Sequence, residues 1–188
     1  MNTAKMYEIV TMKESVRVPP KFLEESSLES VKKALREGVE GMMDKEKGII
    51  LCVTSVKEIS DGNIIAGDGA VYYDTLFEAL VYKPELHEVV DGEVIEVVEF
   101  GVFVRIGPLD GLVHVSQASD EFMSFSKEGV LSGKTGGKSL KVGDRVRARL
   151  VTISLKSASS KIGLTMKQPG LGKFEWLEEE RKGGTEKK

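Results

Sequence analysis

Alternating apolar and polar residues between Gly92 and Gln117 predict three strands of a sheet that is buried on one side only. Such period-2 alternation is typical of strands that place one face in a core and the other in solvent. A turn over Pro108–Gly111 separates the second strand from the third. The predicted strands are Glu93–Val98, Gly101–Ile106 and Leu112–Val115. The inner face of the second strand would carry Val102, Val104 and Ile106.

The outer face of these strands carries aromatic and basic side chains. Phe103 and Arg105 fall on it in the second strand, and His114 falls on it in the third. A β-bulge at Gly101 would add one residue and bring Phe100 to the same face as Phe103. An outward histidine taken alone is more often structural than functional, so the hypothesis depends on the combination. Exposed rings beside cations are typical of surfaces on which unpaired bases stack, which indicates RNA binding.

The rest of the second half completes a barrel. Two further alternating segments, Arg145–Leu155 and Lys161–Lys167, bring the number of predicted strands to five. Ala118–Lys138 is rich in Ser, Gly and Lys and is expected to be a long loop, with a helical turn over Asp120–Ser124. Five strands with a long loop after the third are what an OB-fold barrel requires.

Charge is unevenly spread along this half, although the net charge of the chain is only -3. Pro84–Glu99 carries acidic residues and no Lys or Arg, whereas the fourth strand is basic. Arg145, Arg147 and Arg149 alternate there with apolar residues, so their guanidinium groups are expected on one face. Such segregation can give a local basic face on an acidic protein.

The first half predicts a small α+β unit. Ser26 followed by Glu29 is a capping box that opens a helix, and Gly41 is a plausible stop. Lys83-Pro84 ends the unit. The predicted strands are Tyr7–Val18, Ile49–Ile59, Asn63–Ala66 and Ala70–Tyr82. The order β-α-β-β-β predicts one helix packed on an antiparallel sheet.

Composition indicates a globular protein, since 40% of the residues are hydrophobic and 30% are charged. No apolar run approaches the roughly 20 residues of a membrane span, and no signal peptide opens the chain. We therefore expect a cytoplasmic protein that makes no contact with a membrane. Cys52 permits no internal disulfide and is expected to be buried in the run Ile49–Val53.

The sequence contains no complete catalytic or cofactor-binding motif. Two near-matches to a phosphate-binding loop, Gly133-Lys134-Thr135 and Gly137-Lys138-Ser139, lack the glycine required five positions before their own glycine, where Glu128 and Ser132 stand. Two distant histidines and one cysteine do not make a zinc site. We expect no metal, no cofactor and no catalytic activity. A nuclease is the enzymatic alternative, and its candidate metal ligands in the first half are Asp61, Asp68 and Asp74.

Three motifs in the second half resemble the ribosomal-protein S-one type of OB fold over about Val90–Lys167. They are Phe100-Gly-Val-Phe103-Val, Asp110-Gly-Leu-Val-His114-Val-Ser and Val142-Gly-Asp-Arg-Val. In that family two phenylalanines and the histidine bind RNA, together with an acidic and a basic residue near strands four and five. Lys161 matches the basic position, and Ser154 stands near the acidic one. With the outward arginines added, the expected RNA-binding residues are Phe100, Phe103, Arg105, His114, Arg145, Arg147, Arg149 and Lys161.

Motifs along about Met6–Arg181 resemble the family of the archaeal RNA polymerase E-prime subunit, which is similar to the seventh subunit of eukaryotic RNA polymerase II. They are Tyr7-Glu-Ile, Val18-Pro19-Pro20, Gly67-Asp68-Gly69, Leu80-Val81-Tyr82, Gly107-Pro-Leu-Asp-Gly-Leu and Leu164-Thr-Met-Lys-Gln-Pro169. The resemblance implies a truncated ribonucleoprotein-like α+β domain over residues 1–83, followed by an all-β five-stranded OB barrel over residues 84–182. A short helix over Gly172–Arg181 would dock Phe174 and Leu177 onto the barrel, and residues 1–5 and 183–188 would be disordered.

The same resemblance implies a non-catalytic stalk subunit of the polymerase. It implies a heterodimer with the F subunit of that enzyme, a core-docking loop and an OB barrel that guides nascent single-stranded RNA. The residues of the expected docking loop are Gly67, Asp68, Gly69 and Ala70. The alternative is an RNA-binding S-one module of an exosome cap or a translation factor. Those proteins usually combine this domain with a KH or zinc-ribbon unit, or begin with it, and neither companion motif is present here.

Overall fold

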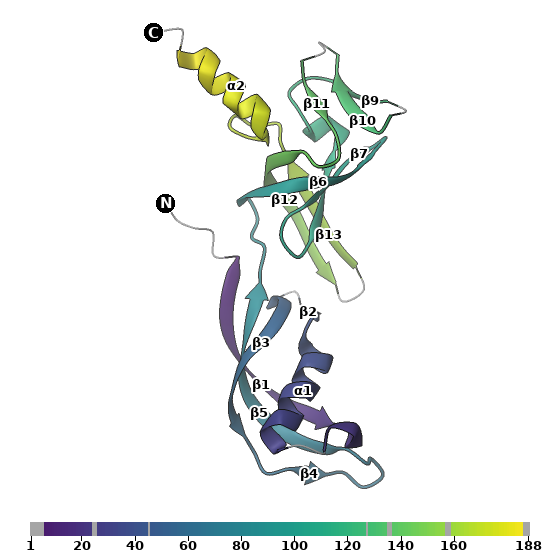
Figure 1. The fold of residues 1–188 in the computed structure, drawn as a ribbon, viewed down its shortest axis with the longest axis vertical. Helices are drawn as coiled ribbons and strands as arrows, with labels where there is room; N and C mark the ends of the chain where they lie inside the picture. The colour runs from purple at the N-terminus through teal and green to yellow at the C-terminus, as the bar shows by residue number, and fades with distance from the viewer. Residues whose placement is uncertain are drawn as a thin grey trace. The chain divides into compact units, whose positions relative to one another are not determined.

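The chain forms two compact units, whose main boundary lies between Pro84 and Glu85 (Figure 1). The computed structural model describes residues 6–23, 26–44, 46–126, 128–134, 137–156 and 159–185. The expectation of disorder over residues 1–5 lies outside the described residues. Each unit has its own sheet and its own apolar core, so the two are described in turn.

The first unit is an antiparallel sheet whose main strands run in the order β1-β5-β3-β2. The short strand β4 pairs with β5 next to this path. Every strand predicted for this half is present, although the strand expected over Asn63–Ala66 is shorter. The strands are β1 (Tyr7–Val18), β2 (Met43–Asp44), β3 (Gly48–Ile59), β4 (Asn63–Ile64) and β5 (Val71–Tyr82).

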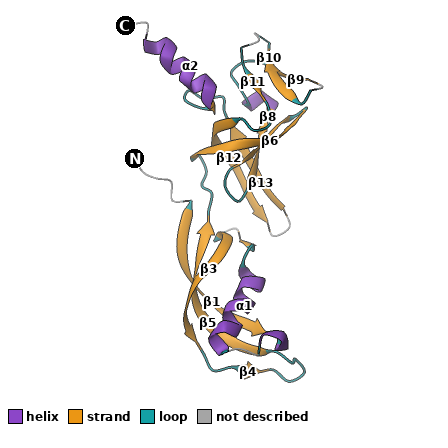
Figure 2. Ribbon diagram, viewed as in Figure 1, coloured by secondary structure: helices purple, strands orange, loops and turns teal. Residues whose placement is uncertain are grey.

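Helix α1 (Ser27–Val39) packs on one face of this sheet, as predicted (Figure 2). The first half of the predicted capping box is confirmed, because the Ser26 hydroxyl oxygen accepts a hydrogen bond from the Glu29 backbone N–H at 3.4 Å, whereas the Glu29 carboxylate pairs with Lys32 at 2.9 Å. A single 3-10 turn, η1 (Pro20–Phe22), connects β1 to the helix. Val31 and Leu35 of the helix are fully buried in one apolar cluster with Phe77 of β5. Burial of that apolar stripe holds the helix on the sheet.

Cys52 is half-buried, so the expectation that it is buried is wrong. The register between β3 and β5 shifts between Ile50 and Cys52. An irregularity of this kind turns the following residues relative to the sheet, which interrupts the run of buried positions that ends at Ile50.

The second unit is a closed barrel with the strand order β13-β8-β7-β6-β12-β14, and pairing between β12 and β13 closes it. The five predicted strands are present, and a two-residue strand joins them at the edge. The strands are β6 (Val89–Val98), β7 (Gly101–Arg105), β8 (Asp110–His114), β12 (Arg145–Lys156), β13 (Ser159–Thr165) and β14 (Gly172–Lys173). The alternation is confirmed, because Val102, Val104 and Ile106 are buried in the core together with Val113, Val146 and Leu150.

Residues 118–138 contain strands, so the prediction of a long loop with a helical turn over Asp120–Ser124 is wrong. A three-stranded antiparallel sheet in the order β11-β10-β9 projects from the barrel (Figure 2). Its strands are β9 (Met123–Ser126), β10 (Val130–Gly133) and β11 (Ser139–Leu140). Met123, Leu131 and Leu140 give the sheet a buried apolar side.

Helix α2 (Phe174–Thr185) follows the barrel. Leu177 is buried at its base as expected, Trp176 is buried beside it, and Phe174 is half-buried. The helix extends to Thr185, so the disorder expected from residue 183 is wrong for residues 183–185, and residues 186–188 lie outside the described residues. Among the described residues, no helix is long and apolar enough to cross a membrane.

Candidate nucleic-acid interface

A groove of about 570 Å³ lies on the outside of the barrel, along strands β7, β8, β12 and β13. We call it the outer groove. Its apolar lining includes Leu112 and Val151, and its polar lining includes the hydroxyl groups of Thr152 and Ser160. Phe103, His114 and Lys161 also line it. Three of the eight residues expected to bind RNA are therefore brought together in one concave surface.

Phe100 lies next to this groove and packs against Phe103. The two ring centroids are 6.3 Å apart and the ring planes meet at 85°, an edge-to-face arrangement. Phe103 is half-buried and Phe100 is 51% exposed, so both rings keep an accessible surface. The expectation that both rings lie on the same side of the sheet is confirmed.

The route by which Phe100 reaches that side differs from the predicted bulge at Gly101. Phe100 lies in the turn between β6 and β7, and its carbonyl oxygen accepts a hydrogen bond from the Val115 N–H at 2.9 Å. The register shift is in β6, between Val94 and Glu96, whereas β7 and β8 pair without a break. Gly101 is needed for close approach, since a Cβ atom there would collide with the Val113 carbonyl oxygen.

The His114 ring is oriented by the residues that follow it. Its Nδ1 accepts a hydrogen bond from the Ser116 N–H at 3.2 Å and lies 2.9 Å from the Ser116 hydroxyl oxygen. A neutral imidazole that accepts through Nδ1 carries its proton on Nε2. His114 is exposed, so the Nε2–H is available to donate to a ligand in the outer groove.

Lys161 supplies the cation of the groove. It is exposed on β13, and no ion-pair partner for it occurs in the part of the chain that the structure describes. Asp110 also lines the groove, but its carboxylate lies 3.3 Å from Arg105 Nε at the rim. An ammonium group in the same groove as the Phe103 ring is suited to the phosphate of a nucleotide whose base stacks on that ring.

The four expected arginines do not line the outer groove. Arg147 is held by Asp91 through two hydrogen bonds, of 2.7 and 3.1 Å, and Arg105 is held by Asp110. Arg145 and Arg147 both lie about 5 Å from the Phe174 ring at the start of α2. The Nε of Arg149 is buried and has no hydrogen-bond partner among the described residues.

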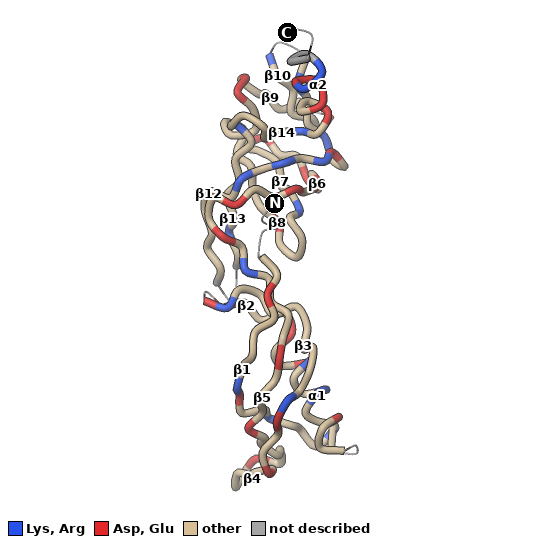
Figure 3. The backbone as a smooth tube through the Cα atoms, turned by 90° about the vertical axis from the view of Figure 1, so that its left-hand side faces the viewer, with Lys and Arg blue, Asp and Glu red and all other residues tan. Residues whose placement is uncertain are grey.

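The sheet also cancels the charge segregation seen along the sequence. The acidic strand β6 pairs with the basic strand β12, which places Glu93 opposite Arg145 and Asp91 opposite Arg147. Glu93 is in turn opposite Arg105 on β7, so basic and acidic residues alternate across the strands. Figure 3 shows acidic and basic positions interspersed over this unit. The three arginines of β12 lie on one face as predicted, because Val146, Ala148 and Leu150 between them are buried. That face is not uniformly basic, because acidic residues of β6 lie beside it and Asp91 pairs with Arg147.

In the first unit, Asp68 fixes the expected docking loop. Its carboxylate accepts hydrogen bonds from Arg17 at 2.7 and 2.8 Å, from the Tyr72 hydroxyl at 2.7 Å and from the Ala70 N–H at 3.1 Å. The hydrogen bonds from Arg17 and Tyr72 hold the pKa of Asp68 well below its usual range. Gly67 has a φ of +92°, which favours glycine at this turn. Among the described residues, no group of three His, Cys, Asp or Glu side chains is placed to hold a metal ion.

Comparisons with known proteins match both units. Residues 13–69 match the family described as the SHS2 domain found in the N terminus of Rpb7p/Rpc25p/MJ0397, and residues 83–164 match the S1 RNA binding domain. DNA-directed RNA polymerase subunit Rpo7 of Sulfolobus acidocaldarius is 44% identical over 177 residues, which cover 93% of this chain and 97% of that protein. Rpo7 of Saccharolobus solfataricus is 36% identical over 180 residues, with coverage of 94% and 100%. RPB7 of Saccharomyces cerevisiae is 32% identical over 106 residues, with coverage of 55% and 62%.

An SHS2 domain followed by an S1-type OB barrel defines a two-domain class of protein in which the second domain is of an RNA-binding type. The chain belongs to the Rpo7/Rpb7 family of DNA-directed RNA polymerase subunits. The resemblance to polymerase subunits and the expected fold class are thereby confirmed.

Proposed function

We propose that this chain is the non-catalytic stalk subunit of an archaeal DNA-directed RNA polymerase, acting in the cytoplasm. Its first unit would dock on the polymerase core and pair with the F subunit of the enzyme, and its second unit would bind nascent RNA. Family membership supports the place in the polymerase. The shared groove of Phe103, His114 and Lys161 is the observation that carries the RNA-binding role.

The outer groove supplies the two contributions that single-stranded RNA binding needs. Base stacking on Phe103, with Phe100 beside it, is worth about 1–3 kcal/mol per base and tolerates any sequence. A phosphate contact from Lys161 adds a term that weakens with salt and carries no sequence information. Weak and sequence-tolerant capture suits a transcript that must keep moving outward, because tight specific binding would stall it.

Of the eight residues expected to bind RNA, we assign the main role to Phe100, Phe103, His114 and Lys161. Arg105 and Arg147 would contribute less, because each already pairs with a carboxylate. Arg145 and Arg149 lie on the same strand as Arg147, outside the outer groove. Their contribution would be a general attraction for a polyanion.

The loop over Gly67–Ala70 is proposed to dock on the core. Next to it, Ile64 at the end of β4 and the following Ile65 are 77% and 53% exposed, so two adjacent large aliphatic side chains face solvent. The hydrogen bonds of Asp68 hold the loop in one conformation before binding, which lowers the entropy cost of docking.

The partner-binding face of the first unit is proposed to include strand β1. This strand lies at one end of the sheet, and Tyr7 and Ile9 on it are 51% and 65% exposed. An exposed edge with apolar side chains is a surface that natural proteins usually cover. The polymerase F subunit is the proposed covering chain.

Affinity purification from the native cell, with identification of the bound chains, tests the place in the polymerase. Recovery of the polymerase core and its F subunit is expected. The RNA role is tested in the same material by crosslinking to nascent RNA, with the double variant Phe103→Ala, His114→Ala beside Val142→Ala. Val142 is 58% exposed and lies outside the groove, so its variant is a control. Unchanged crosslinking in the double variant would remove the assigned surface.

A further inference from the structure

Phe122 is a large aromatic residue whose side chain is not buried in the barrel core. Its side chain is 67% exposed, at the start of the small sheet formed by β9, β10 and β11. The Lys134 ammonium lies 5.0 Å from the centroid of its ring, and the Lys134 N–H donates a hydrogen bond to the Phe122 carbonyl oxygen at 3.2 Å. An exposed ring with an adjacent cation combines the two chemical features that recognise a nucleotide of single-stranded RNA.

The position of Phe122 connects it to the outer groove. Phe122 lines a second pocket, of about 330 Å³, together with Ser116 and Lys167. Ser116 is the residue that holds the His114 ring, and the 3-10 turn η2 (Val115–Gln117) contributes to both hollows, since Gln117 lines the outer groove. The two hollows are therefore both lined by residues of one three-residue turn.

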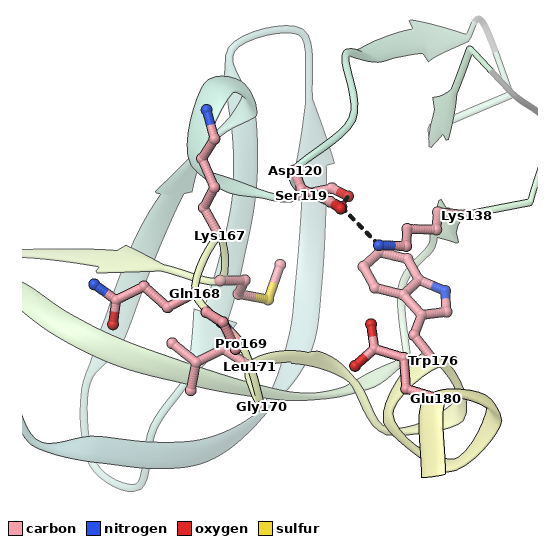
Figure 4. Close-up of a pocket in the computed structure, with 11 residues that line it drawn as sticks. Ser119, Asp120, Lys138, Lys167, Gln168, Pro169, Gly170, Leu171, Trp176 and Glu180 are labelled. Atoms are coloured by element: carbon pink, nitrogen blue, oxygen red, sulfur yellow. Dashed lines mark hydrogen bonds and ion pairs between the residues drawn. The ribbon is translucent and has the colours of Figure 1, made fainter. Parts of the chain in front are cut away.

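The charges around the second pocket leave cations available for phosphate. Asp120 lines the pocket, but its carboxylate is held by Lys138 at 2.7 Å and by the Ser119 hydroxyl at 2.9 Å. Those hydrogen bonds lower the pKa of Asp120 to about 2, so it stays ionised and paired. Figure 4 shows Lys138 between the Asp120 carboxylate and the Trp176 ring, in a neighbouring pocket that Lys167 also lines.

Lys167 is the second available cation. It is exposed, and it has no ion-pair partner in the described ranges of the chain. Glu121 also lines the pocket, and its carboxylate lies close against the Gly133 backbone. A nucleotide stacked on one face of Phe122 would have the Lys134 ammonium over the opposite face of the ring and Lys167 across the pocket.

We propose that Phe122, Lys134 and Lys167 form a second stacking site for single-stranded RNA, which continues the path that begins at Phe103 and His114. The proposal rests on the RNA-binding role assigned to the outer groove, and it extends the site onto the projecting β9–β11 sheet. An RNA long enough to pass the η2 turn would occupy both sites, whereas a short one would occupy the outer groove alone.

The proposal is tested by comparing alanine variants of Phe122 and of the nearby Phe125 in their binding to a short and a long RNA. Oligouridylates of about 4 and about 12 nucleotides, near the lower and upper range of OB-fold site sizes, are titrated against the full chain by fluorescence anisotropy. Phe122→Ala should weaken binding of the long RNA about fivefold or more and leave the short RNA unchanged. Phe103→Ala should weaken both. Phe125→Ala is the matched control, because Phe125 is 37% exposed on β9 and lines neither hollow.

Each of the contrary outcomes removes either the second site alone or the outer groove together with it. Equal binding of the long RNA by the Phe122→Ala variant and the unmodified chain, with Phe103→Ala still defective, removes the second site and leaves the outer groove in place. An equal loss in Phe125→Ala and Phe122→Ala attributes the effect to the structure of the projecting sheet and also removes the second site. Unchanged binding of both RNAs by Phe103→Ala removes the outer groove itself, and the second site with it. Phe122→Trp, which keeps a stacking ring, should restore binding of the long RNA.

Discussion

Phe100 and Phe103 meet edge to face, with ring centroids 6.3 Å apart, although one lies in a turn and the other in the middle of a strand. The turn that ends β6 returns Phe100 to the outer side of the sheet, where Phe103 borders the outer groove. The pair therefore extends the aromatic surface from the groove to the turn between β6 and β7. Phe103 contributes to the groove wall, and Phe100 supports it from the side.

This arrangement predicts unequal effects of removing the two rings. Phe103→Ala should weaken binding of a short oligouridylate about fivefold to a hundredfold, the range expected for losing one stacked base. Phe100→Ala should have a smaller effect, because that ring does not line the groove. Anisotropy titrations at one fixed salt concentration measure both. A larger loss for Phe100→Ala than for Phe103→Ala would contradict the assignment.

Replacing Lys161 or Arg147 should change the salt dependence of RNA binding to different extents. Lys161→Ala should make the plot of log K against log salt concentration shallower. The magnitude of its negative slope should fall by about one, as expected for the loss of one phosphate contact. Arg147→Ala is the matched comparison, because Arg147 is already neutralised by Asp91 at 2.7 Å. The slope of that variant should stay close to that of the unmodified chain. RNA titrations over a series of salt concentrations give the slopes, and equal slopes for the two variants would refute the distinction.

The different roles of these cations could not be read from the sequence. Alternation is a local signal, so it correctly placed Val102 and Val104 inside the barrel and Phe103 outside. The pairing of β6 with β12 is not local, because Asp91 and Arg147 are 56 residues apart. From the sequence alone, the basic strand and the acidic segment therefore look like two separate charged regions. Only the pairing of β6 with β12 shows that their charges lie next to each other.

The projecting sheet was missed for a different reason. Its strands are only two to four residues long, which is too short for alternation to be distinguished from chance. Met123, Leu131 and Leu140 become a buried set only when the three strands pair. Phe122 was therefore placed in a loop, and only its exposed ring beside Lys134 in the structure marks it as a candidate for binding.

In the first unit, Asp68→Asn should loosen the loop over Gly67–Ala70. The hydrogen bonds from Arg17 and Tyr72 hold the pKa of Asp68 below its usual range, so the carboxylate stabilises the loop above the unfolded-state pKa of about 4. That stabilisation is lost only as the pH falls through the lower pKa of the folded state. Amide hydrogen exchange at Ala70, whose N–H donates to Asp68, should be faster in the variant at neutral pH. Asp61→Asn, in a nearby exposed turn, serves as the control, and equal exchange rates in both variants would contradict the bracing role.

The ion pair between Asp144 and Lys173 predicts a large loss of stability when it is broken. Both side chains are at least nine-tenths buried, 3.1 Å apart, and the pair fastens β14, just before α2, to the turn before β12. Burial alone would lower the pKa of Lys173, but its hydrogen bonds to Glu175 and Asp144 together raise it. The lysine contribution is therefore fully present at neutral pH and is lost only as the pH rises through the raised pKa.

Asp144→Ala would leave the Lys173 ammonium group buried without its buried partner, which costs about 3 kcal/mol or more. For a unit of roughly 100 residues, that loss lowers the unfolding midpoint of the second unit by about 12–24 °C. Glu175→Ala removes the other partner of Lys173, but Glu175 is 73% exposed, so its loss should cost less than about 1 kcal/mol. Thermal unfolding followed by circular dichroism at pH 7 compares the two. Equal midpoints for the two variants would show that burial of the Asp144–Lys173 pair does not hold β14 and the start of α2 on the barrel.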